Sequence, residues 1–254
     1  MEHEFENKVA IVTGASSGIG RACALAYARR GAAVVVADVD DEGSTETERM
    51  ITAAGGRAVH VHCDVAVATD VEAMVNKAIE AYGRLDFACN NAGIAGTPAT
   101  TADYPEAVWR RVIDVNLNGV WLCMKYEIPK MLASGGGSIV NMASILGEVG
   151  YATASAYVAA KHGVIGLTQS AAIEYATKGI RVNAVCPAFI YTPMLEEAGI
   201  IKGTDMYSFI AQQHPMKRLG TVDEIAEATM WLSSSAASFV TGHALLADGG
   251  YVAQ

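Results

Sequence analysis

Basic residues are scarce in this chain of 254 residues, in which 18 Lys and Arg stand against 27 Asp and Glu and the net charge is −9. No run of Lys or Arg provides the basic surface that nucleic-acid binding needs, and anionic membranes are disfavoured for the same reason. No apolar run is long enough to span a membrane, and the acidic segment Met1–Glu6 lacks the apolar core of a secretory signal. We therefore expect a cytoplasmic protein with no nucleic-acid or membrane partner.

Metal-ligating and disulfide-forming patterns are also missing. No Cys-x-x-Cys pair occurs, which argues against a zinc knuckle or a redox dithiol. His60 and His62 share one face of a predicted strand, but no Cys or carboxylate cluster accompanies them, so we expect no metal site. The cysteines are few and widely spaced, mostly in apolar stretches typical of buried thiols: Cys23, Cys63, Cys89, Cys123 and Cys186.

Short apolar runs alternate along the chain with segments of helical period. The predicted strands are Lys8–Val12, Ala33–Ala37, Ala58–His62, Leu85–Cys89, Ser138–Met142, Ile180–Cys186 and Ala244–Ala247. The predicted helices are Arg21–Arg30, Gly43–Ala54, Val67–Tyr82, Tyr104–Leu132, Ala152–Lys178 and Asp223–Leu232. This alternation predicts a single α/β domain over residues 1–254, a doubly wound (Rossmann) fold. Its seven-stranded, mostly parallel sheet would have the order 3-2-1-4-5-6-7, with helices on both faces and a small substrate lid over about 188–221.

A glycine-rich turn follows the first predicted strand. The segment Thr13–Gly20 has the spacing G-x-x-x-G-x-G and leads into an Ala-rich helix. Glycines permit a tight turn and close approach, and the N–H groups of the helix then face a pyrophosphate. Position after a strand and before a helix favours dinucleotide binding, although a tight turn alone is the simpler explanation.

The second predicted strand ends at Asp38, where a carboxylate can accept hydrogen bonds from the hydroxyls of an adenosine ribose. The same carboxylate would repel a 2′-phosphate, and no Lys or Arg occupies Ser16, Ser17 or Val39 to attract one. We therefore predict NAD as the cofactor and disfavour NADP. A solvated loop acid is the alternative, since acidic residues are plentiful just after this strand. Asp64 follows the third strand, within reach of an adenine amino group.

Tyr157 and Lys161 lie four residues apart on a predicted helix, so both side chains leave the same face. A Tyr side chain has a reference pKa of about 10, and a nearby ammonium favours the phenolate and lowers that pKa. Ser144, at the end of the fifth predicted strand, offers a hydroxyl donor to an oxygen that gains negative charge. The pair alone is also typical of an ordinary amphipathic helix face.

In combination, these motifs resemble the short-chain dehydrogenase/reductase family. The resemblance runs from about Lys8 to Gly250. It depends on the order and spacing of Thr13-Gly14-(x)3-Gly18-Ile19-Gly20, Asn90-Asn91-Ala92-Gly93, Asn116, Ser144, Tyr157-(x)3-Lys161 and Asp248-Gly249-Gly250.

The resemblance implies a role for each matching residue. Tyr157 would exchange the proton with the carbonyl or alcohol oxygen, and Ser144 would polarise that oxygen. Lys161 would lower the pKa of Tyr157 and hold the nicotinamide ribose. Asn116 would bend its helix and anchor a water that links Lys161 to solvent. The predicted catalytic residues are thus Asn116, Ser144, Tyr157 and Lys161, and the predicted substrate contacts are Ser144, Tyr157 and Leu146.

Cofactor contacts are predicted along the carboxyl edge of the sheet, with Ile190 and Thr192 at the carboxamide of the nicotinamide. The full set is Gly14, Ser17, Gly18, Ile19, Gly20, Asp38, Asp64, Val65, Asn91, Ala92, Gly93, Tyr157, Lys161, Pro187, Ile190 and Thr192. One departure stands out, because Ala188 follows Pro187 where the family usually has Gly. Ala tolerates positive φ poorly, so a loop that needs such a backbone would have to rearrange.

The predicted reaction is hydride transfer between a secondary alcohol and its ketone, with NAD as the acceptor or donor. Apolar side chains are expected to face an apolar or cyclic substrate: Ile94, Ala95, Ile145, Leu146, Val149, Phe189, Met194, Leu195, Met206 and Phe209. Glu148 and Tyr151 could add a contact to a hydroxyl group. Two alternatives remain, a 3-oxoacyl-[acyl-carrier-protein]-type reductase and a non-catalytic NAD-binding scaffold or sensor. We expect a homotetramer or a homodimer.

Overall fold

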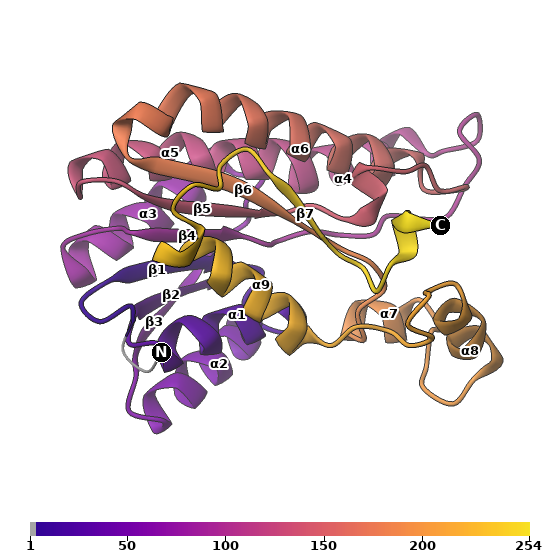
Figure 1. Cartoon of the computed structure of the whole chain (residues 1–254), viewed down its shortest axis with the longest axis horizontal. Helices are drawn as coiled ribbons and strands as arrows, with labels where there is room; N and C mark the ends of the chain where they lie inside the picture. Colours follow the sequence, from indigo (N-terminus) through magenta and orange to yellow (C-terminus); the bar gives the residue numbers. More distant parts are fainter. Residues whose placement is uncertain (1–3) are drawn as a thin grey trace.

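The computed structural model describes residues 4–254, and within them seven strands form one sheet in the order β3-β2-β1-β4-β5-β6-β7 (Figure 1). The strands are β1 (Val9–Thr13), β2 (Ala33–Asp38), β3 (Arg57–His62), β4 (Phe87–Asn90), β5 (Gly137–Met142), β6 (Ile180–Pro187) and β7 (Ala244–Ala247). Every neighbouring pair is parallel, so the predicted strand order and doubly wound class are confirmed.

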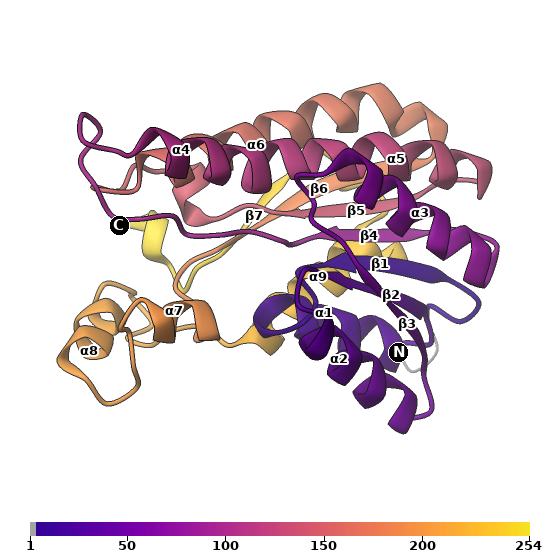
Figure 2. The same cartoon turned by 180° about the vertical axis from the view of Figure 1, so that it is seen from behind.

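Helices cover both faces of the sheet (Figures 1 and 2). One face carries α1 (Gly18–Arg29), α2 (Asp41–Ala53) and α9 (Val222–Ser233). The other carries α3 (Ala68–Tyr82), α4 (Glu106–Ile113), α5 (Gly119–Ala133) and α6 (Ser155–Tyr175).

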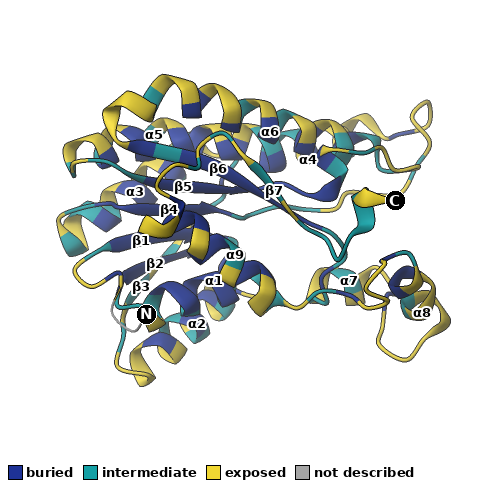
Figure 3. Cartoon of the chain, in the orientation of Figure 1, coloured by how far each residue is buried: buried dark blue, intermediate teal, exposed yellow. Residues whose placement is uncertain are grey.

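Each face of the sheet has its own apolar core. In β1, Ile11 faces the helices α3, α5 and α6, whereas its neighbour Val12 faces α1 and α9. A strand that is buried on both sides reads as a continuous apolar run, which explains the strand sequences of this chain. Figure 3 accordingly shows the central strands as buried along their length.

The order of strands reverses between β1 and β4, because β1 connects to β2 on one side and β4 connects to β5 on the other. Loops that leave the carboxyl ends of these two strands therefore diverge to opposite faces and leave a crevice between them. The glycine-rich turn after β1 and the Asn91-Ala92-Gly93 loop after β4 lie at this crevice.

The long helix predicted over Tyr104–Leu132 is interrupted. Between α4 and α5, the five residues Asp114–Asn118 form a π-helical turn. The amide of Asn116 explains the distortion, because its Oδ1 accepts from Ile94 N and its Nδ2 donates to Ile94 O, each at 2.8 Å. Single π turns occur mostly at functional sites.

Helix α6 begins at Ser155, three residues after the predicted start at Ala152. Thr153 has φ +66°, a left-handed backbone that ends any helical path at this residue. Ala99 N donates to Thr153 O at 3.1 Å, which ties the start of α6 to the loop after β4.

The segment between β6 and α9 extends beside the layered body (Figure 1). It contains α7 (Pro193–Glu197) and α8 (Asp205–Gln212) and packs around its own small apolar cluster. An isolated bridge between Ile190 and Gly220 closes the base of this segment. No helix in residues 4–254 combines the length and the apolarity that a membrane crossing requires.

A buried polar network lies between the sheet and α5. Glu127 is fully buried, and Asn90 Nδ2 donates both to Glu127 Oε2 at 3.1 Å and to Asn141 Oδ1 at 3.0 Å. Glu127 Oε1 and Asn90 Oδ1 have no hydrogen-bond partner within the described residues. Burial raises the pKa of Glu127 to about 8, so the side chain is a neutral acid at pH 7.

Replacing Glu127 by Gln should flatten the pH dependence of stability. The pKa of this side chain rises from 4.5 to about 8 on folding, so the free energy of unfolding falls as pH rises through that interval and levels off above it. The slope is at most about 1.4 kcal/mol per pH unit. Urea midpoints at pH 5 to 8 measure it, with the exposed Glu174→Gln as control. Equal slopes in the wild type and Glu127→Gln would contradict a neutral Glu127.

Candidate active site

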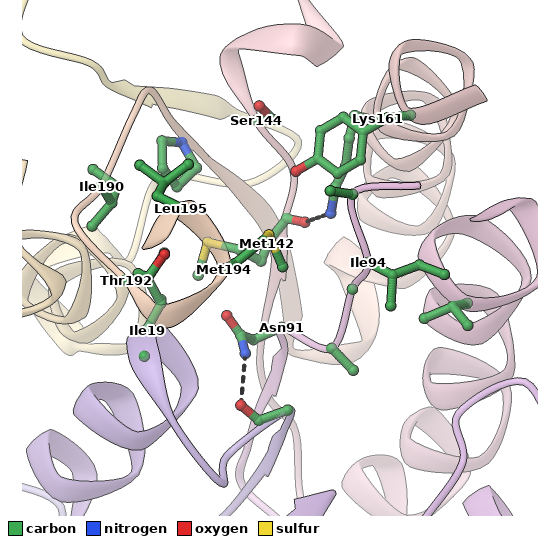
Figure 4. A pocket seen from close by; sticks show the side chains of 18 of the residues that line it. Ile19, Asn91, Ile94, Met142, Ser144, Lys161, Ile190, Thr192, Met194 and Leu195 are labelled. Atoms are coloured by element: carbon green, nitrogen blue, oxygen red, sulfur yellow. Dashed lines mark hydrogen bonds between the residues drawn. The ribbon is translucent and has the colours of Figure 1, made fainter. Parts of the chain in front are cut away.

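A cavity of about 500 Å³ opens at the carboxyl edge of the sheet. Its walls come from the turn after β1, the ends of β2, β4 and β5, the first turns of α6, and the loop after β6 (Figure 4). All of the residues predicted to bind cofactor line this cavity except Gly20, and Ser144 and Leu146 line it as well. Gly20 and Asn116 lie behind the lining and support residues that belong to it.

The glycine-rich turn has the backbone that only glycine adopts without strain. Gly14 and Gly18 have φ of +65° and +53°, and a Cβ on Gly20 would overlap the carbonyl oxygen of Gly14. Asn91 Nδ2 donates to the carbonyl oxygens of Thr13 and Gly14 at 3.0 and 3.2 Å, and so fixes the turn to the loop after β4 (Figure 4). No side chain caps the first turn of α1, whose N–H groups remain available to an anion.

Two acidic residues lie at the adenosine end predicted for the cavity. Asp38 Oδ2 accepts from Ser16 N at 3.0 Å, which holds the carboxylate at the mouth of the turn. Asp64 Oδ2 pairs with Arg111 at 3.0 Å, while its Oδ1 accepts from Ala66 N. Arg111 lines the cavity and was missed by sequence reasoning, because only the fold brings α4 next to the end of β3.

The loop after β4 is held from two sides. Thr13 Oγ1 accepts from the backbone N–H groups of Asn91 and Ala92, at 3.0 and 3.1 Å. Behind the loop, a Cβ on Gly93 would lie only 3.1 Å from Asn116 Oδ1. Both ends of the Asn116 amide are bonded to the backbone of Ile94, so this side chain positions the loop. Its link to a water molecule stays a prediction.

Ser144, Tyr157 and Lys161 meet at one end of the cavity. Ser144 Oγ accepts from Leu146 N at 3.1 Å, which leaves the hydroxyl proton free to donate. Lys161 is 3% exposed, and its Nζ donates to Met142 O at 2.7 Å (Figure 4). The same Nζ lies 5.4 Å from the centroid of the Tyr157 ring.

Burial dominates the electrostatics of this group. It raises the pKa of Tyr157 to about 12, with a partial offset from the hydrogen bond to Ser144. It also lowers the pKa of Lys161 to about 8. Sequence reasoning expects a lowered pKa for Tyr157, and the direction differs here because desolvation by burial is the largest effect on the phenol. At neutral pH the site therefore holds a neutral phenol beside a cationic amine.

The loop after β6 keeps an ordinary backbone despite the missing glycine. Among the described residues, positive φ outside glycine occurs only at Asn7, Thr153 and Lys217, so Ala188 needs no left-handed conformation. The loop thus accommodates Ala188 without left-handed backbone strain. Thr192 lies directly against the glycine-rich turn, since a Cβ on Gly18 would be 3.5 Å from its methyl group.

The wall beyond Tyr157 is mostly apolar. The predicted substrate-side residues that line it are Ile94, Ala95, Ile145, Leu146, Tyr151, Phe189, Met194 and Leu195. Val149, Glu148, Met206 and Phe209 are not among the residues that line it, so a substrate contact for these four stays a prediction. Met206 and Phe209 are 53% and 62% exposed, because α8 turns them outward. The rings of Tyr151 and Phe189 meet edge to face, with centroids 6.3 Å apart.

His60 and His62 take no part in this cavity. They lie on the edge strand β3, where His60 pairs with Glu48 and His62 with Asp41 of α2. Among residues 4–254 no cluster of His, Cys, Asp or Glu is suited to hold a metal ion.

The sheet is parallel and doubly wound, and its crevice holds the glycine-rich turn Thr13–Gly20, here called the glycine cradle, together with Ser144, Tyr157 and Lys161. This combination defines a nicotinamide-dependent alcohol dehydrogenase or ketoreductase. A family model described as enoyl-(acyl carrier protein) reductase matches residues 14–252. The chain belongs to the short-chain dehydrogenase/reductase family.

Several relatives match over nearly their whole length. The chain is 46% identical to cyclohexanol dehydrogenase of Acinetobacter sp. (strain SE19), with 100% of this chain and 98% of the relative covered. It is 47% identical to cis-4-hydroxycyclohexanecarboxylate dehydrogenase of Sinomonas cyclohexanicum, with both chains covered in full at 100%. Among solved structures, levodione reductase superposes with a TM-score of 0.95 at 37% identity, covering 98% of this chain and 99% of the other.

Proposed function

We propose that the protein catalyses reversible hydride transfer between a cyclic secondary alcohol and its ketone, with NAD as the cofactor. The observation that carries the proposal is the Ser144, Tyr157 and Lys161 group at one end of an apolar cavity whose other end is a glycine cradle.

The side chains divide the work at the substrate oxygen. Tyr157, a neutral phenol, donates its proton from Oη to a carbonyl oxygen as negative charge develops there. Ser144 adds a second hydrogen bond to that oxygen, since Leu146 N already occupies a lone pair of its Oγ. Lys161 supplies positive charge beside the phenol, and Met142 O fixes its ammonium. When bound, the nicotinamide carries the hydride to or from the substrate carbon.

The residues of the cavity fit such a cofactor. A tight glycine turn and the uncapped N-terminus of α1 suit the pyrophosphate. The carboxylate of Asp38 lies where it can accept hydrogen bonds from the hydroxyl groups of the adenosine ribose. At the same place it would repel a 2′-phosphate. Arg111, the cation at this end of the cavity, is already paired with Asp64. These contacts support NAD over NADP.

A cyclic substrate is supported by the shape of the wall and by the relatives. Tyr151 and Phe189 present two aromatic rings to the cavity, and aliphatic side chains complete the surface. Aromatic faces bury large apolar area, as a saturated or unsaturated ring requires. The names of three relatives specify six-membered rings, including 2,5-dichloro-2,5-cyclohexadiene-1,4-diol dehydrogenase of Sphingobium indicum at 43% identity.

Residues 188–221 are proposed to act as a lid over the substrate. Phe189, Met194 and Leu195 line the cavity from this segment, and Phe189 and Leu195 also pack against its small cluster of Ile200, Ile210, Ala211 and Leu219. A segment with its own core and a narrow base at Ile190 and Gly220 can move as a unit.

We also propose that the chain assembles as a homotetramer or a homodimer in the cytoplasm. Large apolar side chains are exposed on three elements, namely Trp121 of α5, Ile173 of α6 and Phe239 after α9. Burying them between copies would remove apolar surface from water. All five cysteines are buried as free thiols, which suits a reducing compartment.

A spectrophotometric assay tests this function. The rate of NADH formation with cyclohexanol and cyclohexane diols should exceed the rate with open-chain secondary alcohols. The kcat/KM for NAD should exceed that for NADP by at least about 10-fold. Asp38→Ser should reduce the ratio of kcat/KM for NAD to kcat/KM for NADP, and the order of alcohols by rate should stay the same. Activity confined to acyl thioesters with NADPH would contradict the proposal and support the acyl-carrier-protein alternative. NAD binding without turnover of any alcohol would support the scaffold alternative.

A further inference from the structure

The C-terminal tail, residues 248–254, lies beyond the end of β7 (Figure 1). Its Tyr251 ring contacts two aromatic rings, with centroid distances of 5.3 Å to His214 and 6.1 Å to Phe189. Phe189 in turn lies edge to face against Tyr151, and both of these line the cavity. A continuous row of aromatic rings therefore leads from the tail to the substrate wall.

The tail is fastened to the segment that follows α8. Gln254 Nε2 donates to Gln213 O at 2.7 Å, and the Tyr251 hydroxyl donates to Gln213 Oε1 at 3.3 Å. Met216 N donates to Gly249 O at 3.2 Å. Within the tail, the carboxylate of Asp248 accepts from the backbone N–H groups of Gly250 and Val252, each at 2.9 Å.

His214 gives the row a fixed centre. It is 1% exposed, and its Nδ1 bonds to Ile210 O at 3.0 Å, so the ring is held on α8. Its centroid lies 5.9 Å from that of Phe189, again edge to face. Phe189 is thus packed from behind by His214 and Tyr251, with its remaining side toward the cavity.

We propose that Tyr251 is a positioning residue for the substrate. Through its contacts with Phe189 and His214, Tyr251 holds the Phe189 side of the aromatic wall against a cyclic substrate. Through Gln213 it also fixes the end of the lid, the segment after α8, to that wall. This inference rests on the proposed function for its substrate, but the tie between tail and lid stands independently of any substrate. The hydrogen bonds and ring contacts of the tail go to the 188–221 segment and not to the glycine cradle, so the hold on the pyrophosphate should not depend on the tail.

Two variants of Tyr251 separate ring packing from the hydroxyl bond. Tyr251→Ala removes the ring behind Phe189 and should raise KM for cyclohexanol about 10-fold, since small misplacements of a binding wall are costly. The KM for NAD and the kcat should stay within about twofold of the wild type. Tyr251→Phe keeps the ring and should retain the wild-type KM. An unchanged KM for cyclohexanol in Tyr251→Ala, or a parallel rise in KM for NAD, would overturn the proposal.

Limited trypsin digestion tests the tie to the lid without any substrate. Lys202 is exposed between α7 and α8, and its cleavage reports on opening of that segment. At equal thermal stability, Tyr251→Ala should be cut there faster than both the wild type and Tyr251→Phe. Equal rates in all three would refute the tie. If the wild type oxidises no cyclic alcohol, the proposed function fails, and the digestion result still decides the role of the tail in holding the lid.

Discussion

Replacing Tyr157 by Phe is expected to reduce kcat by about 10³- to 10⁴-fold, the upper range for loss of a general acid or base. The ring stays, so the packing of α6 and the shape of the cavity are kept. Only the hydroxyl is lost, and with it the proton that reaches the substrate oxygen. The Kd for NADH should remain within a few-fold of the wild-type value, because the substitution leaves the glycine cradle and the loop after β4 unchanged. Steady-state kinetics and NADH fluorescence titration measure the two effects separately.

The same helix offers a matched control. Tyr175 and Lys178 also form a tyrosine and lysine pair near the end of α6, with Lys178 Nζ 4.7 Å from the Tyr175 ring centroid. This pair lies outside the cavity, and Tyr175→Phe should leave turnover unchanged. Turnover of Tyr157→Phe within about 10-fold of the wild type, less than the roughly 10²-fold minimum for loss of a general acid or base, would refute the assigned role.

The pKa values of the site favour different directions of reaction at different pH. Because burial raises the pKa of Tyr157 to about 12, the neutral phenol that reduction requires is present throughout the physiological range. Oxidation requires the phenolate, whose population grows with pH. The rate of alcohol oxidation should therefore rise with pH relative to that of ketone reduction.

Local signals in the sequence were sufficient for the fold and for finding residues that meet at one end of the cavity. Gly14 and Gly18 occupy positive φ in a turn, and Tyr157 and Lys161 share a helix face, so each pattern is contained within a few residues. The apolar strands are recognisable because both faces of the sheet are covered. Even the interruption at Asn116 is suggested by a polar residue within an otherwise regular helix.

Contacts set by tertiary structure could not be predicted in this way. Arg111 reaches Asp64 only because α4 crosses the end of β3, and no local sequence pattern around either residue predicts this ion pair. Met206 and Phe209 have the composition of a substrate wall, but the orientation of α8 decides that they point outward. The high pKa of Tyr157 likewise depends on burial, which the spacing to Lys161 does not report.

Replacing Lys161 by Met should have the second-largest effect on catalysis. Met fills similar volume without charge, so the buried site keeps its packing while the ammonium beside Tyr157 and the donor to Met142 O are lost. We expect kcat/KM for ketone reduction to fall by about 10²- to 10³-fold, as is typical for removal of one electrostatic contact to a developing negative charge. Lys178→Met, outside the cavity, is the control and should leave kcat/KM unchanged.

The pH profile gives this substitution a specific signature. Burial lowers the pKa of Lys161 to about 8, so the ammonium is present below that pH and is lost above it. Ketone reduction by the wild type should therefore decline as pH rises through about 8, whereas the residual activity of Lys161→Met should lack that decline. Rates measured from pH 6 to 10 decide the matter. A decline near pH 8 that persists in Lys161→Met would assign the titration to another group, and the cation beside Tyr157 would then not be the source of the effect.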